Sequence, residues 1–310
     1  MSVRVFLIVG MVIALTMNAG CGHKEEPINV SLEKTDTTTA TKKDSGGRPI
    51  RFAVGAMLTP KEGFVYYKHF LDYIGERMGR HIEFVDREDY EEINDLLKSG
   101  GVDAAFVCSG PYVDGHRDFG LELIAAPLAY GKTVYYSYII VSKDSPIRNF
   151  EELRGKTFAF TDPMSNTGTL VPTYMLAKMK ETPDSFFKKY VFSHSHDKSI
   201  KAVSQGIVDG AAVDSLIWDY LDHRGPAFTS KTRIILKSSA YAIPPVVVRP
   251  GLAPEIKRRL KHVILTAHLD KRGASILREM AIEKFVAIDD AAYDSIRKMK
   301  AWTDARKKKK

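Results

Sequence analysis

The sequence predicts an α/β protein of two similar lobes, each a mixed sheet flanked by helices, with a ligand-binding cleft between them. Short apolar runs alternate with amphipathic stretches along most of the chain, as in α/β folds. Two segments share the pattern Val-Asp, small residues, an apolar residue and a serine: GGVDAAFVCSGPY (residues 100–112) and GIVDGAAVDSLIWDY (206–220). A helical stretch precedes each of them. Two extended stretches, residues 135–147 and 232–251, are suited to carry the chain between lobes.

This order of elements predicts a division of the chain. The predicted segments are a signal peptide at 1–21, a flexible tether at 22–48, lobe one at 49–137, lobe two at 138–240, a return to lobe one at 241–303 and a basic tail at 304–310.

Lobe one is expected to open with a strand at Ile50–Val54. A helix follows Pro60 through VYYKHFLDYIGERMG, and a second strand lies in HIEFVD from His81. After Pro250, the amphipathic stretches APEIKRRLKHVILTAHLD and GASILREMAIEKF predict two helices. The chain therefore visits lobe one, lobe two and lobe one again.

In lobe two, the buried strand GKTFAF is followed by the loop TDPMSNTGTLVP (residues 161–172) and then by a helix. Pro172 fits the first helical turn, where a backbone N–H has no intrahelical partner. Free N–H groups and the helix dipole attract anions at such a position. The loop is therefore either an anion site or a helix cap whose hydroxyl groups serve only the helix.

The N-terminal residues predict export. Arg4 precedes an eleven-residue apolar run, Val5–Leu15, and small residues follow before Cys21. Such a run is typical of a secretory signal and is short for a membrane span. NAGC, ending at Cys21, resembles a bacterial lipobox, although Asn18 stands where leucine is usual. We expect a protein of the periplasm or cell envelope, lipid-anchored at Cys21.

The net charge of +8 does not indicate nucleic-acid binding, because the fourteen residues from Arg297 hold eight basic residues and one acidic residue. We expect this tail to be solvated or to lie near anionic lipid headgroups. Only two cysteines, Cys21 and Cys108, are present, so we expect neither a disulfide framework nor a cysteine metal cluster.

The chain resembles the substrate-binding proteins of bacterial ABC importers for phosphonate, phosphite and phosphate, which have the type II periplasmic-binding-protein fold. The resemblance runs from about Ile50 to Leu269 and is carried by VSKDSPIRNFEELRGKTFAFTDPMSNTGTLVPTYML, HSHDKSIKAVSQGIVDGAAVDS and IPP, in that order. It implies transport: a small phosphorus oxyanion as ligand, a membrane permease and ATPase as partners, a monomeric protein, and no metal or cofactor.

The resemblance also implies the binding residues. The family's Ser-x-Ser/Thr-Gly loop corresponds to Ser165, Asn166, Thr167 and Gly168. Its His-Asp pair corresponds to His196 and Asp197, and its acidic residue to Asp214. Its aromatic wall corresponds to Tyr112, Tyr136 and either Tyr66 or Tyr67.

The chemistry of these residues suits a tetrahedral oxyanion. Loop N–H groups, the Ser165 and Thr167 hydroxyls and a protonated His196 would satisfy its oxygens. Asp214 would repel an anion unless the ligand brings a proton or an ammonium group, which favours hydrogen phosphite, hydrogen phosphate or an aminoalkylphosphonate over sulfate. A capping role for His196 and a salt bridge for Asp214 are the alternatives.

Three other functions use the same residues. Ser165, His196 and Asp214 would make a hydrolase triad, but the chain has no G-x-S-x-G elbow, so we predict that it is not an enzyme. A ligand sensor that docks on a membrane kinase or cyclase would have the same fold. A binding protein for a sulfonate or another small anion would also share it.

Overall fold

The computed structural model describes residues 47–55, 60–87 and 89–307. The predicted signal peptide, Cys21 and the tether up to residue 46 lie outside the described residues. Within the described part, no helix combines the length and the apolar composition that crossing a bilayer requires.

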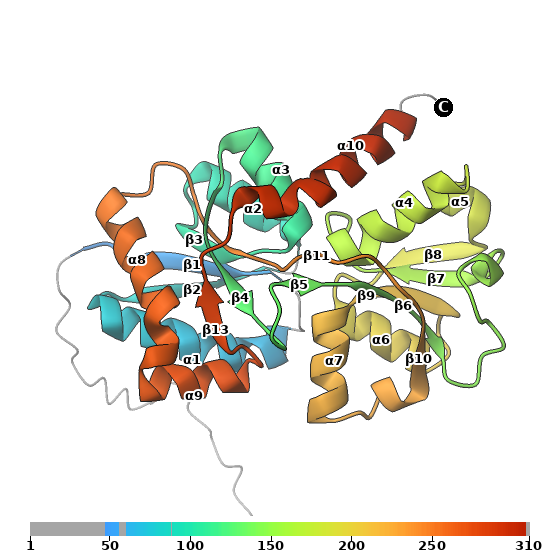
Figure 1. Ribbon diagram of the computed structural model, residues 1–310, viewed down its shortest axis with the longest axis horizontal. Helices are drawn as coiled ribbons and strands as arrows, with labels where there is room; N and C mark the ends of the chain where they lie inside the picture. Colours follow the sequence, from blue (N-terminus) through green and yellow to red (C-terminus); the bar gives the residue numbers. More distant parts are fainter. Residues whose placement is uncertain (1–46, 56–59, 88, 308–310) are drawn as a thin grey trace, which may run out of the picture. The chain divides into compact units, whose positions relative to one another are not determined.

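A six-stranded mixed sheet, in the order β13-β4-β12-β3-β1-β2, is the centre of lobe one (Figure 1). Its strands are β1 (Ile50–Val54), β2 (Ile82–Asp86), β3 (Ala104–Phe106), β4 (Glu122–Leu128), β12 (Val246–Val248) and β13 (Lys284–Val286). β1 is parallel to β2 and β3, whereas β12 runs antiparallel to β3 and β4. The predicted first strand is therefore confirmed, with β2 beside it.

Helices cover both faces of this sheet. Three of them share one apolar cluster, through residues such as Phe70, Leu260 and Ile276: α1 (Pro60–Met78), α8 (Pro254–Thr266) and α9 (Lys271–Glu279). On the other face, α2 (Tyr90–Ser99) and α3 (Ser109–Phe119) pack through Ile93 and Val113. Short 3-10 turns lie at η4 (Ala267–Leu269) and η5 (Asp290–Tyr293).

A five-stranded sheet, in the order β10-β6-β9-β7-β8, is the centre of lobe two. Its strands are β6 (Ser137–Ser142), β7 (Thr157–Phe160), β8 (Lys189–Phe192), β9 (Gly210–Asp214) and β10 (Thr232–Lys237). One face carries α4 (Val171–Lys178) and α5 (Pro183–Phe186), and the other carries α6 (His196–Ser204) and α7 (Ser215–Arg224). The 3-10 turns η1 (Glu151–Leu153) and η3 (Thr229–Lys231) lie at its margins.

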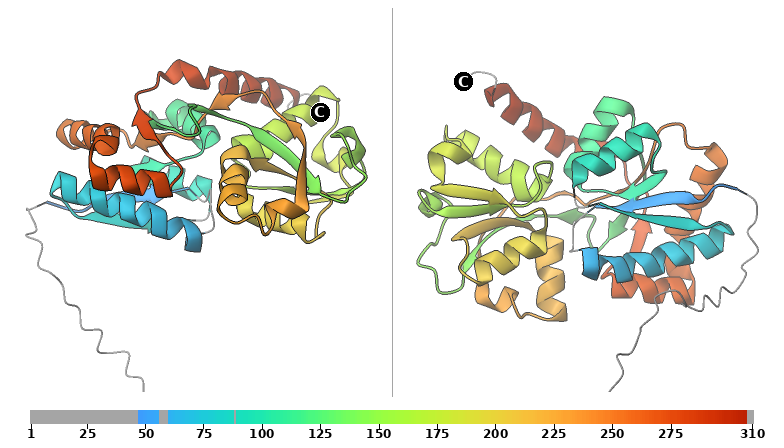
Figure 2. Two further views of the ribbon diagram at one scale, coloured as in Figure 1. Left: turned by 60° about the horizontal axis from the view of Figure 1, so that its bottom comes forward. Right: turned by 180° about the vertical axis from the view of Figure 1, so that it is seen from behind.

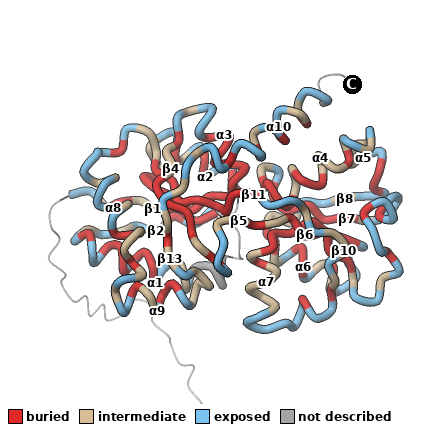
Figure 3. Tube along the Cα trace, in the orientation of Figure 1, coloured by how far each residue is buried: buried red, intermediate tan, exposed pale blue. Residues whose placement is uncertain are grey.

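Two antiparallel segments, β5 (Val134–Tyr135) and β11 (Tyr241–Ala242), join the lobes. β12 and β13 then return the chain to the first sheet (Figure 2). Figure 3 shows buried residues along the inner strands of both sheets and along these crossing segments, whereas the outer sides of the helices are exposed. The ends of both sheets therefore face a common junction.

One expectation for the C-terminal part is wrong. The stretch ending at Phe285 is not one helix: α9 ends at Glu279, Ala281 takes a φ of 55°, and β13 pairs with β4. Burial of Phe285 in the lobe-one core favours the strand. The basic run from Arg297 lies in α10 (Asp294–Lys307), and the last three residues of the predicted tail lie outside the described residues.

α10 packs against both lobes. Lys300 Nζ lies 2.5 Å from Asp114 Oδ2 on α3 of lobe one. The Trp302 ring meets the ring of Tyr174, on α4 of lobe two, edge to face with centroids 4.9 Å apart. The described end of the chain therefore spans the junction between the lobes (Figure 1).

Candidate functional site

The predicted anion loop follows β7 and is built as a wide helical turn. Ser165 has extended backbone angles, and its Oγ accepts the Gly168 N–H at 3.0 Å. Asn166–Leu170 then form a π-helical turn, η2, that continues into α4. Such turns are frequent at functional sites. The helix-cap interpretation therefore holds for the Ser165 oxygen, which stabilises the turn itself.

Gly168 is required because no space exists for a side chain. A Cβ at this position would lie 1.7 Å from Oγ1 of Thr161, at the end of β7. Glycine thus allows the turn to touch the strand it follows, and this contact fixes where the rest of η2 points.

Thr167 offers a hydroxyl group that nothing else uses. Its carbonyl accepts a hydrogen bond from Ser137 Oγ at 2.6 Å, which ties η2 to β6. Its Oγ1 is fully buried and has no hydrogen-bond partner among the described residues. Because an unpartnered buried hydroxyl costs roughly 1–3 kcal/mol, it is a strong candidate for a ligand contact.

His196 is the first residue of α6 and is a neutral donor in this structure. The Asp214 N–H donates to its Nδ1 at 3.0 Å, so the ring proton lies on Nε2. Burial lowers the pKa of His196 from 6.5 to about 3. The expectation of a protonated His196 is therefore wrong. Its buried Nε2 has no partner among the described residues and remains available to donate.

Asp214 ends β9 and caps α7. Its Oδ1 accepts the Leu216 N–H at 2.7 Å, whereas its Oδ2 is buried without a partner in the described part of the chain. Burial raises the pKa of this carboxyl to about 8. Asp214 therefore holds a proton near neutral pH, and no salt bridge to a lysine is found among the described residues.

The three unpartnered atoms belong to one edge of the lobe-two sheet. β7 and β9 are parallel, so the loop after β7 and Asp214 emerge at the same edge. The Asp214–His196 hydrogen bond brings α6 to that edge, and η2 packs against β9. A hydroxyl, an imidazole N–H and a carboxyl thus belong to residues at the same edge of the sheet.

Lobe one closes over this edge with a thiol and aromatic rings. Cys108, just before α3, accepts the Asn166 N–H, and burial raises the pKa of its thiol. The Tyr135 hydroxyl lies 3.8 Å from Cys108 Sγ and accepts a hydrogen bond from Asn166 Nδ2 at 3.1 Å. A Cβ on Gly110 would lie 2.3 Å from the Met164 carbonyl oxygen, so the lobes are in close contact.

The predicted tyrosines divide into two groups. Tyr67, on α1, is near the site. Burial raises the pKa of Tyr67 to about 12, and the nearby charge of Asp214 adds a smaller part of this increase. Tyr112 is not brought to the group: its hydroxyl donates to Asp290 Oδ1 at 2.5 Å within lobe one. Tyr136 also lies elsewhere, with Lys237 Nζ 3.8 Å from its ring centroid. Tyr66 contacts Tyr220 near the cleft, with ring centroids 6.1 Å apart.

Three residues at the site were missed from the sequence: Tyr90, Cys108 and Tyr135. Tyr135 neighbours the predicted Tyr136, and alternation along an extended segment sends the two side chains in opposite directions. The buried Tyr90 packs with Cys108 and Met164. No local pattern distinguishes these three, because their position depends on contacts between lobes.

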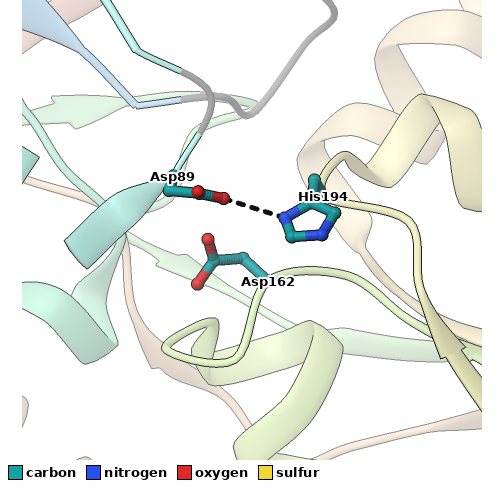
Figure 4. A group of neighbouring side chains, drawn as sticks. All are labelled: Asp89, Asp162 and His194. Atoms are coloured by element: carbon teal, nitrogen blue, oxygen red, sulfur yellow. Dashed lines mark hydrogen bonds and ion pairs between the residues drawn. The ribbon is translucent and has the colours of Figure 1, made fainter. Parts of the chain in front are cut away.

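A polar group at the lip of the cleft joins the lobes (Figure 4). His194 Nδ1 lies 2.8 Å from Asp89 Oδ1, across the junction. The Asp162 carboxylate accepts the N–H of Tyr90 at 3.1 Å and that of Met164 at 2.7 Å. Asp89, Asp162 and His194 offer ligand atoms within 4.8 Å of one another, as a metal site would. The existing bonds already give these groups a role in holding the lobes together.

The same contacts argue against a hydrolase triad. The Ser165 oxygen accepts from its own turn, His196 accepts a backbone N–H, and the Asp214 carboxylate accepts the Leu216 N–H. None of these bonds is the serine–histidine or histidine–carboxylate link that would activate a nucleophile.

Fold and site together define a two-lobed binding protein of the type II periplasmic-binding-protein class, as predicted. The family described as "ABC transporter, phosphonate, periplasmic substrate-binding protein" matches residues 52–293. The chain belongs to this family. It is therefore a periplasmic substrate-binding component of an ABC importer that works with a membrane permease, and it is not an enzyme.

Individual relatives agree with the family match. The phosphonates-binding periplasmic protein of Escherichia coli is 26% identical over 235 residues, covering 74% of this chain and 69% of that protein. The phosphate-import protein PhnD of Mycolicibacterium smegmatis is 25% identical over 254 residues, covering 74% and 78%. A binding protein of a Pseudomonas aeruginosa phosphonate transporter superposes with a TM-score of 0.79 at 25% identity, covering 84% of this chain and 88% of that one.

Proposed function

We propose that this protein captures a phosphorus oxyanion at the edge where Thr167, His196 and Asp214 meet, and that it delivers this ligand to its permease. The observation that carries the proposal is the convergence of three buried polar atoms without partners: Thr167 Oγ1, His196 Nε2 and Asp214 Oδ2. Buried polar groups are normally hydrogen-bonded, so three of them at one edge indicate a polar ligand.

The three atoms match the demands of a tetrahedral anion. The Thr167 hydroxyl and the His196 Nε2–H donate to two ligand oxygens. Asp214 and a third oxygen share one proton, which either partner supplies because the carboxyl pKa is raised to about 8. Oxygens of phosphorus acids can hold a proton and sulfate oxygens do not, so a phosphorus ligand still shares a proton once Asp214 has lost its own, whereas sulfate meets a charged carboxylate.

Asn166, Gly168 and Tyr67 complete the proposed site. Asn166 Oδ1 is buried without a partner in the described residues, and the amide is held at the junction because its Nδ2 donates to the Tyr135 hydroxyl. Gly168 maintains the close turn, and Tyr67 supplies an aromatic surface from lobe one. Ser165 acts through its cap, with its hydroxyl hydrogen available to the ligand.

Closure of two lobes would enclose the ligand. We propose that residues 49–137 with 241–303 move as one body and residues 138–240 as the other. The paired segments β5 and β11 would absorb the rotation. Ligand bound first to lobe two would then be covered by Tyr90, Cys108 and Tyr67.

We further propose that the protein is a monomer held at the membrane by a lipid on Cys21. The lipobox-like NAGC and the polar residues 22–48 support this arrangement, since a tether would let an anchored binding protein reach its permease. Globomycin sensitivity of processing, and its loss in Cys21→Ser, would test the anchor.

A binding experiment tests the proposed ligand class. Protein lacking residues 1–46 is titrated by calorimetry with phosphite, phosphate, methylphosphonate, sulfate and taurine, while small-angle scattering follows closure. We expect a phosphorus oxyanion to bind most tightly and to reduce the radius of gyration. Tighter binding of sulfate or taurine than of every phosphorus compound would contradict the proposal.

A further inference from the structure

An apolar cavity opens between the lobes beside the oxyanion groups. Its volume is about 80 Å³, and it is partly open to solvent. Its walls come from α1, β3, α7 and the segment after α9, and they include Tyr66, Phe106, Leu216, Ile217, Tyr220 and Met280. None of its lining residues, all within the described part of the chain, carries a charged side chain.

The cavity lies next to the Asp214 end of the site, because it is lined by residues that closely follow Asp214. Leu216, whose N–H binds Asp214 Oδ1 at 2.7 Å, places its side chain in the cavity wall, as does Ile217. From lobe one, Tyr67 lines the same cavity, and its pKa is raised by burial and by the charge of Asp214. The carboxyl therefore stands between the polar edge of lobe two and the apolar space.

We propose that this cavity receives an apolar substituent on the phosphorus atom, so that the ligand is an alkyl- or arylphosphonate of several carbons. The inference rests on the proposed function, because it assumes that the oxyanion lies at Thr167, His196 and Asp214. From there, the substituent enters the cavity past Leu216 and Tyr67.

The walls select against the other phosphorus ligands. Inorganic phosphate or phosphite would leave the rings of Tyr66 and Tyr220 uncovered by ligand. An ammonium group would lose its water inside the cavity and find no carboxylate in the walls, which is costly. Aliphatic chains and aryl rings gain from burial against aromatic side chains. An aminoalkylphosphonate, allowed by the sequence, is therefore disfavoured.

A ligand series with the unmodified protein tests the inference. Phosphate, phosphite and methyl-, propyl-, phenyl- and 2-aminoethylphosphonate are compared by calorimetry. We expect affinity to rise roughly three- to four-fold for each added methylene that is buried. Phenylphosphonate should bind at least about tenfold more tightly than methylphosphonate, and 2-aminoethylphosphonate more weakly than propylphosphonate.

The outcomes separate this inference from the proposed function. If phosphate or phosphite binds as tightly as phenylphosphonate, the cavity does not receive a substituent, although the oxyanion site stands. If 2-aminoethylphosphonate is the tightest ligand, the apolar character assigned to the substituent is wrong. If no phosphorus compound binds, the proposed function itself fails.

A second experiment fills the cavity with a larger side chain. Leu216→Trp retains the backbone N–H that binds Asp214, and it places an indole in the space. We expect phenylphosphonate to lose at least about tenfold in affinity, while methylphosphonate changes less than about threefold. Ile207→Trp, at a position 67% exposed after α6, adds the same bulk elsewhere as a control. Equal losses for both ligands in a folded Leu216→Trp protein, or none for either, would overturn the inference.

Discussion

The two walls of the cleft differ in what they offer a ligand. The lobe-two wall presents polar atoms without partners, on Thr167, His196 and Asp214. The lobe-one wall presents mainly rings and a thiol, from Tyr67, Tyr90 and Cys108. Both walls start at strand ends that precede helices, α7 after β9 and α3 after β3.

This difference indicates that lobe two recognises the ligand and that lobe one covers it. The lobe-two groups are held by bonds within lobe two: Ser137 with η2, His196 with Asp214, and Asp214 with α7. They are therefore preorganised before closure. With the proposed closure, the lobe-one groups would reach the site only when the lobes meet. Changes in lobe two should abolish binding or change its selectivity, whereas changes in lobe one should weaken it slightly.

Gly168→Ala should have the largest effect, because the new Cβ would meet Thr161 Oγ1 at 1.7 Å and displace η2. We expect at least about a hundredfold loss in phosphonate affinity, together with a lower Tm, since several donors move at once. Calorimetry and thermal unfolding measure both. Gly225→Ala, at the end of α7 with open space around it and an extended φ of 177°, is the control for replacing a glycine as such. Near-normal binding in Gly168→Ala would show that the turn does not set the site.

Closure of the ligand-free protein should weaken as pH rises. In the closed form, burial raises the pKa of Asp214 to about 8, whereas the opened cleft returns it toward 3.8. Between these values the closed form holds the extra proton, so the closed-to-open ratio should fall by up to about tenfold per pH unit and level off above about pH 8.

The closed-to-open ratio can be measured from the distances between spin labels placed on the two lobes. Asp214→Asn isolates the effect, because the variant keeps all other titrating groups, including His196. An identical pH profile in Asp214→Asn would mean that Asp214 does not control closure.

Asp214→Asn should remove selectivity above about pH 8, where the parent carboxyl is charged and admits only a ligand oxygen that carries a proton. An amide cannot share a proton with the ligand, yet it still donates a hydrogen bond. We expect the preference for phosphonate over sulfate to fall by roughly thirtyfold, since a charge-assisted bond contributes about 1.5–3 kcal/mol. Competition calorimetry measures the ratio. If the parent ranking of ligands survives, the carboxyl does not contact the oxyanion.

Thr167→Val should reduce phosphonate affinity by about tenfold while leaving Tm nearly unchanged, because its hydroxyl has no partner within the described residues. Ser165→Ala is the matched variant on the same turn. It removes a cap and should lower stability by about 0.5–2 kcal/mol. If Thr167→Val lowered stability and Ser165→Ala lowered affinity instead, Ser165 and not Thr167 would be the ligand contact.

Tyr90→Phe should have the smallest effect, less than about threefold in affinity, because this ring covers the site from lobe one and its hydroxyl contributes nothing to the proposed oxyanion contacts. Its backbone N–H, which binds Asp162, is unchanged. Tyr112→Phe, at the bond to Asp290 within lobe one, is the control. A loss at Tyr90 as large as that at Thr167 would remove the distinction between the walls.

The sequence alone determined the local elements and the chemistry of the loop. Ile50–Val54 and GKTFAF are strands because short apolar runs have few other ways to be buried, and the segment after β7 turns into a helix as its polar residues and Pro172 predict. Ser165 to Gly168 are contiguous, so one motif identifies the whole turn. The alternation of strands and helices likewise predicts the two-lobed class.

Only the tertiary structure decided which side chains face the cleft and in what state of charge. Tyr135 and not Tyr136 reaches Asn166, because pairing of β5 with β11 fixes the direction of each side chain. Neutral His196 depends on a backbone N–H eighteen residues away in sequence, and the proton on Asp214 depends on burial. These properties arise from contacts between distant segments, which residue patterns along the chain do not contain.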